Sequence, residues 1–586
     1  MKKSRILLLA SVSLVISVCF WTFAGFNLLS SSFNKKIIRE RAMVLADRYI
    51  NFKYSNLERK DDSYIKDYQN LYDVSNYKLK LSFDIPKKYI YGNLEMKALN
   101  LSDTLNNLYL NFSDDMAVNK ILLNGSDAVF IRQNDFIIVN TNKSLKKEGD
   151  FLVEISYEGS PKNKGFDSFG FKTFDGEPAV YTLSEPEYAP LWWPCKDITT
   201  DKFTSEVILT VPKELTAVSN GLLQEVSDDT DSTKTFYWKS GYPITTYLVS
   251  IAIGKYDKWT DIYTTADGSK NMNVDYYSYP SYTDKAKYDW KNTVSMLEFY
   301  SKIFGEYPFI NEKYGMAMFG WSGGAMEHQT ISSMGYTTVT GDQRYESIVA
   351  HELVHQWFGD AVSPESWKDI WLNEGFATYG EALWEEHTGG KEGYDRFMKN
   401  QDYGFYKGTV YAPEGFIFGP TVYKKGAWCL HMLRGVTGDS VFFKIVRTYY
   451  EKYKYKNAGT HDFKNVCEQV SGTDLTYFFN QWIFTGTGRP EYKYSWKYDD
   501  FMDQKNTGVY TLRVNLRQTQ KEELIYKMPV NILVKTDKGE ENFTFFNEMQ
   551  IQQFEQPVSG KPLDVIIDND NMILKKIQKE DYKDKL

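Results

Sequence analysis

The stretch His351-Glu352-Leu353-Val354-His355 places two histidines four residues apart, and Glu374 follows in Asn373-Glu374-Gly375-Phe376. Side chains at this spacing lie on one face of a helix, about 5–6 Å apart, so both imidazoles can bind one metal ion. Zinc accepts imidazole and carboxylate ligands, and a catalytic zinc site has three protein ligands and one open position. The sequence therefore predicts one zinc ion per chain, bound by His351, His355 and Glu374. Glu352 is then the base that takes a proton from the attacking water.

The surrounding residues predict the two helices that carry this motif. The chain has only 6 histidines in 586 residues, so roughly a few in a thousand such chains would contain the motif by chance. We expect Asp342 to cap the first helix, with Gly359 and Pro364 after its end. We expect a second helix, which carries the third ligand, from about Asp369 to His387, ending at Thr388-Gly389-Gly390.

Three further motifs accompany the metal motif. They are Leu183-Ser184-Glu185-Pro186-Glu187-Tyr188-Ala189, Gly324-Ala325-Met326-Glu327-His328 and Tyr423-Lys424-Lys425-Gly426-Ala427. With H-E-x-x-H and its downstream glutamate, the chain resembles the M1 family of zinc aminopeptidases, whose signatures include Gly-x-Met-Glu-Asn and Tyr-x-Lys-Gly. The resemblance runs from about residue 75 to 580, and Gln481-Trp482-Ile483-Phe484 is similar to the end of the family's catalytic domain.

The resemblance implies a site that binds the free N-terminus of a peptide. A peptide N-terminus is an ammonium ion with a reference pKa near 8, and two carboxylates can hold it by charge-assisted hydrogen bonds. Glu185 and Glu327 are the implied carboxylates. Tyr423 is implied to donate a hydrogen bond to the oxyanion that forms during hydrolysis. The implied substrate-binding residues are Glu185, Gly324, Ala325, Met326, Glu327 and His328.

Two positions depart from the family pattern. His328 stands where asparagine is usual, and we interpret it as a hydrogen-bonding substitute for the amide. Gly323 stands where a bulkier side chain is common, which suggests a roomier or differently shaped pocket for the first side chain of the substrate. The side-chain specificity of the family therefore does not carry over to this chain.

The N-terminal segment favours a location outside the cytoplasm. Lys2, Lys3 and Arg5 precede an uncharged run from Ile6 to Asn34, and its apolar part is long enough to cross a bilayer as a helix. We expect a transmembrane anchor with an extracytoplasmic catalytic domain. The alternatives are a cleaved signal, which would give a secreted enzyme, and a lipoprotein cut before Cys19.

Composition narrows the function classes further. The formal net charge of −8 argues against nucleic acid as a partner. Four cysteines do not form a disulfide framework. Cys429 and Cys467 are either a pair within the catalytic domain or, the reading we favour, two buried thiols.

The strand and helix patterns predict a multidomain α+β protein. We expect the anchor at 1–29, a charged helical stalk at 30–74 and an N-terminal β-sandwich at 75–258, where Leu94, Met96 and Ala98 alternate with polar residues. A thermolysin-like, mainly helical zinc peptidase domain is expected at 259–490, and a small C-terminal β-sandwich at 491–586. We expect the large helical C-terminal domain of many family members to be missing.

These observations predict a zinc aminopeptidase that removes the N-terminal residue from peptides with a free N-terminus. Two alternatives are a zinc endopeptidase, and a catalytically weak peptide-binding ectodomain in which zinc is structural. The Glu185 and Glu327 pair disfavours the first alternative, and the presence of Glu352 and Tyr423 disfavours the second.

Overall fold

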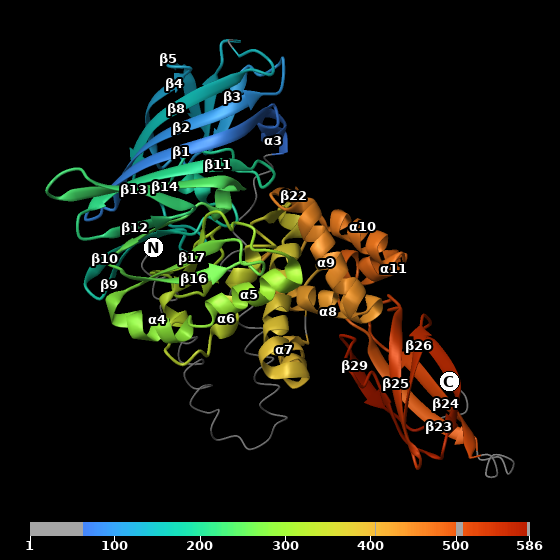
Figure 1. The fold of residues 1–586 in the computed structure, drawn as a ribbon. Helices are drawn as coiled ribbons and strands as arrows, with labels where there is room; N and C mark the ends of the chain where they lie inside the picture. The colour runs from blue at the N-terminus through green and yellow to red at the C-terminus, as the bar shows by residue number, and fades with distance from the viewer. Residues whose placement is uncertain (1–62, 144, 405, 500–507, 583–586) are drawn as a thin grey trace, which may run out of the picture. The chain divides into compact units, whose positions relative to one another are not determined.

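The computed structural model describes residues 63–143, 145–404, 406–499 and 508–582 (Figure 1). The expected anchor at 1–29 and most of the expected stalk at 30–74 lie outside these residues. Within the described ranges, no helix has the length and apolar character that a membrane span requires.

The N-terminal part of the described chain consists of β-sheets (Figure 1, blue to green). A short helix, α3 (Ser63–Gln69), precedes the first strand, which begins at Tyr72 and therefore inside the segment expected as a helical stalk. Tyr72 and Val74 are buried and alternate with polar residues, which favours a strand over a helix at this point. Leu94, Met96 and Ala98 are buried on the next strand, as their alternation predicts.

Three sheets make up this part of the chain. The eight-stranded sheet has the order β13 (Leu222–Asp228), β14 (Thr233–Ile244), β11 (Phe203–Pro212), β1 (Tyr72–Asp84), β2 (Tyr89–Asn100), β8 (Asp150–Gly159), β4 (Ala117–Leu123) and β5 (Ser126–Asp127). The four-stranded sheet has the order β12 (Thr216–Ser219), β15 (Ile251–Gly254), β10 (Glu177–Thr182) and β9 (Phe169–Phe174), and the three-stranded sheet has the order β3 (Asn107–Asn111), β7 (Phe136–Asn140) and β6 (Phe130–Gln133).

The catalytic part combines one five-stranded sheet with helices. The sheet has the order β16 (Asp257–Thr264), β17 (Asn271–Ser278), β18 (Lys313–Phe319), β20 (Ser332–Gly335) and β19 (Ala325–Met326), so β19 is an edge strand. Strands β21 (Val362–Pro364) and β22 (Lys456–Ala458) form a separate pair. The helices are α4 (Thr283–Asp289), α5 (Thr293–Phe304), α6 (Glu346–His355), α7 (Trp371–Gln401), α8 (Gly426–Thr437), α9 (Asp439–Tyr453), α10 (Thr460–Ser471) and α11 (Thr476–Phe479), with π-helical turns η6 (Thr421–Lys425) and η7 (Asn480–Phe484).

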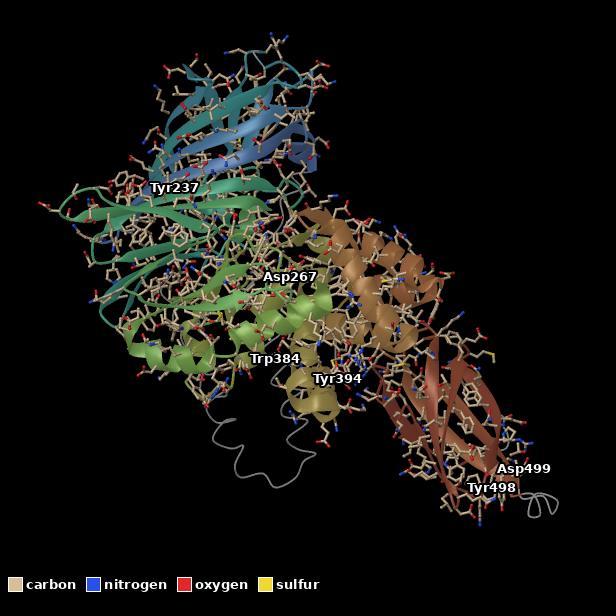
Figure 2. The ribbon with its side chains drawn as sticks, viewed as in Figure 1. Tyr237, Asp267, Trp384, Tyr394, Tyr498 and Asp499 are labelled. Carbon is tan, nitrogen blue, oxygen red and sulfur yellow. The ribbon has the colours of Figure 1, made fainter. Side chains whose placement is uncertain are left out.

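The structure corrects one detail of the predicted helices and confirms another. Helix α6 begins after Tyr345 without a side-chain cap, because the carboxylate of Asp342 binds Arg344 and Thr340 instead. The predicted stop at Thr388-Gly389-Gly390 is confirmed, because Gly390 has non-helical dihedral angles (φ 62°, ψ −161°) and divides α7 into two helical segments. Trp384 and Tyr394 lie on the two sides of this break (Figure 2).

The C-terminal part consists of two sheets (Figure 1, red). One has the order β27 (Ile551–Ser559), β24 (Val509–Gln518), β23 (Glu491–Asp499) and β29 (Lys576–Lys579), and the other has the order β26 (Gly539–Asn547), β25 (Met528–Thr536) and β28 (Pro562–Ile567). The Tyr494 hydroxyl on the first sheet donates to the Val565 carbonyl on the second, and Phe545 stacks on Phe554. The sheets therefore face each other, as expected for a small sandwich.

The cysteines of the described chain are buried free thiols, namely Cys195, Cys429 and Cys467. Cys429 and Cys467 are therefore not paired, in agreement with the reading we favoured from the sequence.

Candidate zinc site and active site

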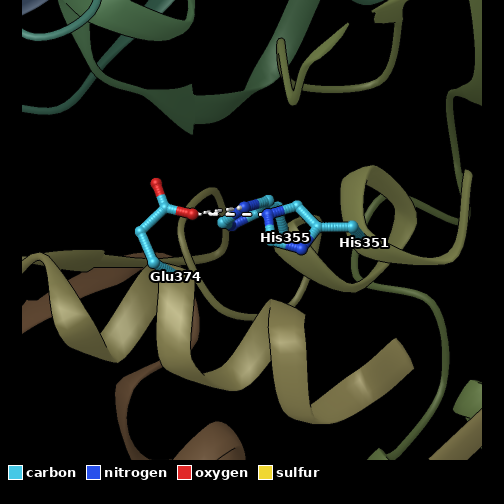
Figure 3. Close-up of side chains that lie close together, drawn as sticks. All are labelled: His351, His355 and Glu374. Atoms are coloured by element: carbon cyan, nitrogen blue, oxygen red, sulfur yellow. Dashed lines mark hydrogen bonds and ion pairs between the residues drawn. The ribbon is translucent and has the colours of Figure 1, made fainter. Parts of the chain in front are cut away.

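Helices α6 and α7 bring the three predicted metal ligands together (Figure 3). The Nε2 atoms of His351 and His355 lie 3.3 Å and 3.4 Å from the same carboxylate oxygen of Glu374. Three ligands that each bind zinc at about 2.1 Å in tetrahedral geometry lie about 3.4 Å from one another. The two distances to Glu374 match this value, and all three donor atoms lie within 4.8 Å of one another, so the group fits a zinc ion.

The other ring nitrogen of each histidine has its own partner. Nδ1 of His351 lies 2.9 Å from a carboxylate oxygen of Glu381, and Nδ1 of His355 lies 3.1 Å from the Phe358 carbonyl oxygen. Because both acceptors require a proton on Nδ1, each Nε2 keeps its lone pair for the metal. The sequence reasoning missed Glu381. The sequence feature that could have indicated Glu381 is its position seven residues, or two helical turns, after Glu374.

Glu352 lies on α6 between the two histidines, and its side chain is buried. Its Oε2 atom accepts no hydrogen bond from any described residue. Burial raises the pKa of Glu352 to about 8 in the metal-free protein. The free oxygen and the raised pKa suit a group that takes up a proton and releases it again.

Glu185 and Glu327 lie beside the metal ligands. Glu327 follows edge strand β19 and Glu185 follows β10, so the two carboxylates come from different sheets. The carboxylates of Glu185, Glu327 and Glu374 each have an oxygen within 4.8 Å of the other two. Glu327 is 3% exposed and Glu185 is 6% exposed, and one oxygen of each has no partner among the described residues. Burial raises the pKa of both carboxylates, and Nδ1 of His355 lies 3.9 Å from Oε1 of Glu327.

The remaining residues of the predicted substrate segment surround the end of β19. Ala325 and Met326 form this strand and pair with Met334 and Ser333 of β20. Gly324 has φ 141°, a conformation that favours glycine. His328 is fully buried, its Nδ1 atom hydrogen-bonds the Ser333 hydroxyl at 2.8 Å, and burial lowers its pKa to about 3. It is therefore a neutral hydrogen-bonding residue.

Trp321 occupies the space beside Gly323. A Cβ atom at this position would lie 2.3 Å from the indole ring of Trp321. The indole therefore fills the space that a side chain at position 323 would occupy, which agrees with a differently shaped pocket, and the size of the pocket stays a prediction.

Tyr423 lies in the π-helical turn η6 beside the metal ligands. Its ring stacks on the His351 imidazole with centroids 5.9 Å apart. Burial raises the pKa of Tyr423 well above its usual value, so its phenol remains protonated and can donate a hydrogen bond. A Cβ atom on Gly375 would lie 3.0 Å from the Gly426 backbone, so two glycines permit the close approach of α7 and the turn that carries Tyr423.

Comparisons with known proteins agree with this arrangement. The model of the peptidase M1 N-terminal domain matches residues 73–248, and the model of the peptidase family M1 domain matches residues 288–482. Together they cover more than half of the chain.

Individual relatives cover different shares of the chain. It is 27% identical over 449 residues to probable aminopeptidase 2 of Sulfurisphaera tokodaii, covering 71% of this chain and 54% of that protein. It thus spans about half the length of that curated relative. A crystal structure of Legionella pneumophila aminopeptidase A aligns with TM-score 0.76 and 18% identity, over 88% of this chain and 60% of that one. The M1 zinc metallopeptidase of Deinococcus radiodurans aligns with TM-score 0.62 and 24% identity, over 72% of this chain and 94% of that one. With a zinc site formed by His351, His355 and Glu374, the chain belongs to peptidase family M1.

Proposed function

We propose that the protein is a zinc aminopeptidase that hydrolyses the N-terminal residue from peptides with a free N-terminus. The observation that carries this proposal is the pair of buried carboxylates of Glu185 and Glu327 beside the metal ligands, each with one oxygen that accepts no hydrogen bond from the described residues. Its relative from Sulfurisphaera tokodaii is described as a probable aminopeptidase, and the Legionella pneumophila aminopeptidase A structure contains aspartic acid.

The two carboxylates match the chemistry of a peptide N-terminus. Two buried carboxylates repel each other and are costly without a cation, so a bound ammonium group would stabilise both. The ammonium group would then fix the first peptide bond near the metal. An acetylated N-terminus has no such charge, and it would leave both carboxylates without a partner.

Edge strand β19 provides a place for the substrate main chain. Its partner β20 lies on one side only, so the other edge of Ala325–Met326 can pair with an extended peptide. Because Glu327 directly follows this edge, a peptide paired there would bring its N-terminus close to the anchor carboxylates.

The residues around the metal have distinct chemical roles in this proposal. A bound zinc ion would supply a Lewis acid that polarises the scissile carbonyl and acidifies the attacking water. Glu352 takes the proton from that water and returns it to the leaving amine. Tyr423 donates a hydrogen bond to the carbonyl oxygen as negative charge develops on it.

Matched peptides test this function against its alternatives. A series of peptides with a free or an acetylated N-terminus is incubated with the enzyme, with and without a chelator, and kcat/KM is measured. We expect free peptides to react about 30- to 4,000-fold faster, because losing one partner of a desolvated charge pair costs about 2–5 kcal/mol. Equal cleavage of both series would indicate an endopeptidase. Binding without turnover would indicate a peptide-binding ectodomain.

We also propose that the uncharged run from Ile6 to Asn34 anchors the protein in a membrane, with the catalytic part outside the cytoplasm. The basic residues before this run and its length support the proposal. N-terminal sequencing of the mature protein tests it, together with membrane fractionation of the full chain and of a variant without residues 1–34. A mature N-terminus within or after the run would instead indicate a cleaved signal and a secreted enzyme.

A further inference from the structure

The carboxylate of Glu327 depends on a short loop between β19 and β20. In this loop the Ile331 amide donates to the His328 carbonyl oxygen at 2.9 Å, which closes a four-residue turn. Thr330 is the third residue of the turn and has φ 66°. This position normally requires glycine, and a β-branched residue here is strained. The loop therefore needs support from outside to keep its conformation.

That support comes from the end of α6, the helix that carries the two histidine ligands. Gln356 follows His355 directly and is fully buried. Its side-chain amide donates to the Glu327 carbonyl oxygen at 3.1 Å, and its Oε1 atom accepts the Thr330 amide at 2.8 Å. One side chain thus holds both ends of the segment 327–330.

The N-terminal sheets hold the same segment from another direction. The amide of Asn220 donates to the Gln329 carbonyl oxygen at 2.7 Å, and the Gly221 main-chain amide donates to the Thr330 hydroxyl at 2.8 Å. Gly221 has φ 76°, and a Cβ atom there would lie 2.1 Å from the Lys239 carbonyl oxygen, so this position accepts only glycine.

Strand β18 contributes the last contact. The buried ammonium group of Lys313 donates to the Thr330 carbonyl oxygen at 3.2 Å. The carbonyl oxygens of Glu327, Gln329 and Thr330 are therefore all held by side chains of other elements. We call these supporting residues, Asn220, Gly221, Lys313 and Gln356, the anchor clamp.

The need for the anchor clamp follows from electrostatics. The Glu327 carboxylate lies within 4.8 Å of two other buried carboxylates, those of Glu185 and Glu374. When these carboxylates are charged, their repulsion favours displacement of Glu327 from the site before substrate binds. Because the anchor clamp fixes the main chain of residues 327–330 before substrate binds, no free energy is needed to order this segment during binding.

We propose that the anchor clamp positions Glu327 and thereby sets the preference of the enzyme for free N-termini. Gln356 and the Asn220-Gly221 turn act as positioning residues, because they reach the substrate only through Glu327. This proposal rests on the proposed aminopeptidase function. It adds that selectivity depends on buried amide groups in two other parts of the chain.

Two substitutions remove different contacts between the anchor clamp and the loop. Gln356→Met keeps the length of the side chain and removes its hydrogen bonds to the main chain of Glu327, His328 and Thr330. Thr330→Val keeps the shape of the side chain and removes the hydroxyl that binds Gly221. Since displacement of a binding group by about 1 Å costs on the order of 100-fold, we expect kcat/KM for free peptides to fall about 10- to 100-fold. The fall should come mainly from KM, with zinc content and the rate on acetylated peptides nearly unchanged.

Matched controls separate positioning from general stability. Gln481→Met also removes a buried glutamine that holds main-chain atoms, those of Lys527, away from the site. Thr293→Val removes a buried hydroxyl that donates to the Trp290 carbonyl oxygen, outside the loop of residues 327–331. Both controls should lower the thermal midpoint and leave the ratio of free to acetylated cleavage unchanged. Thr330→Ser keeps the hydroxyl and should therefore show the native ratio of free to acetylated cleavage.

The outcomes decide between the two proposals. If the native enzyme does not discriminate between free and acetylated peptides, the aminopeptidase function itself is wrong. If the native enzyme discriminates and both Gln356→Met and Thr330→Val keep its full ratio, the anchor clamp does not set selectivity. If Gln356→Met does not fold, Thr330→Val and Thr330→Ser decide the question alone.

Discussion

Removal of the Glu381 carboxylate should weaken zinc binding without abolishing catalysis. Glu381 accepts a hydrogen bond from Nδ1 of His351 at 2.9 Å, and its side chain is 14% exposed. A hydrogen bond to a charged group contributes about 1.5–3 kcal/mol, and each 1.4 kcal/mol changes an equilibrium constant about tenfold. We therefore expect Glu381→Ala to raise the zinc Kd about 10- to 100-fold, in line with other partners of metal-bound histidines.

Competition with a chelator of known affinity measures this Kd directly. Glu381→Gln retains an acceptor oxygen and should show a smaller increase. Glu385→Ala is the matched control, because Glu385 lies on the same helix and binds Arg396 rather than a metal ligand. At saturating zinc, kcat should remain near the native value for all three variants. An unchanged zinc Kd in Glu381→Ala would show that Glu381 does not orient His351.

Three other predictions concern separate groups. Glu352→Gln should retain one zinc ion per chain by metal analysis while kcat falls by several orders of magnitude, and near-native turnover would assign proton transfer to another group. Tyr423→Phe should lower kcat about 100- to 1,000-fold with little change in KM, and a change in KM alone would contradict its role at the oxyanion. Burial lowers the pKa of His328 to about 3, below its value near 6.5 in the unfolded chain, so the native state loses stability as the pH falls through this interval. At about pH 5 the free energy of unfolding is lower by about 2 kcal/mol on this account. The His328→Asn variant lacks this loss, because asparagine does not titrate. The thermal midpoint of the metal-free protein should therefore fall less between about pH 7.5 and about pH 5 in His328→Asn than in the native chain, and equal falls would refute burial of a neutral His328.

The local spacing of residues predicted the metal ligands, because four residues on a helix fix the relation of His351 to His355 wherever that helix lies. Alternation likewise predicted strands such as β2, where one face is buried. The order of the strands was not predictable, since β1 pairs in parallel with β11, more than a hundred residues away. The helix cap at Asp342 was wrong because a neighbouring arginine competes for the same carboxylate.

Sequence reasoning could not find the anchor clamp. Asn220 reads as an ordinary turn residue in the sequence, and its contact with Gln329 spans 109 positions. Gln356 adjoins a metal ligand, but no periodic pattern indicates that its amide turns toward Glu327. Contacts of this kind depend on how the sheets and helices meet, which local patterns do not specify.

The contact between Gly375 and Gly426 restricts how this active site can evolve. A Cβ atom at either position would lie about 3.0 Å from the backbone of the other, closer than carbon atoms normally approach. The separation of the Glu374 helix from the turn of Tyr423 is therefore set by main-chain contact and cannot be tuned by choosing a different rotamer. Random mutagenesis should yield few active variants at these two positions, and a new substrate preference should arise from substitutions at other residues around the site.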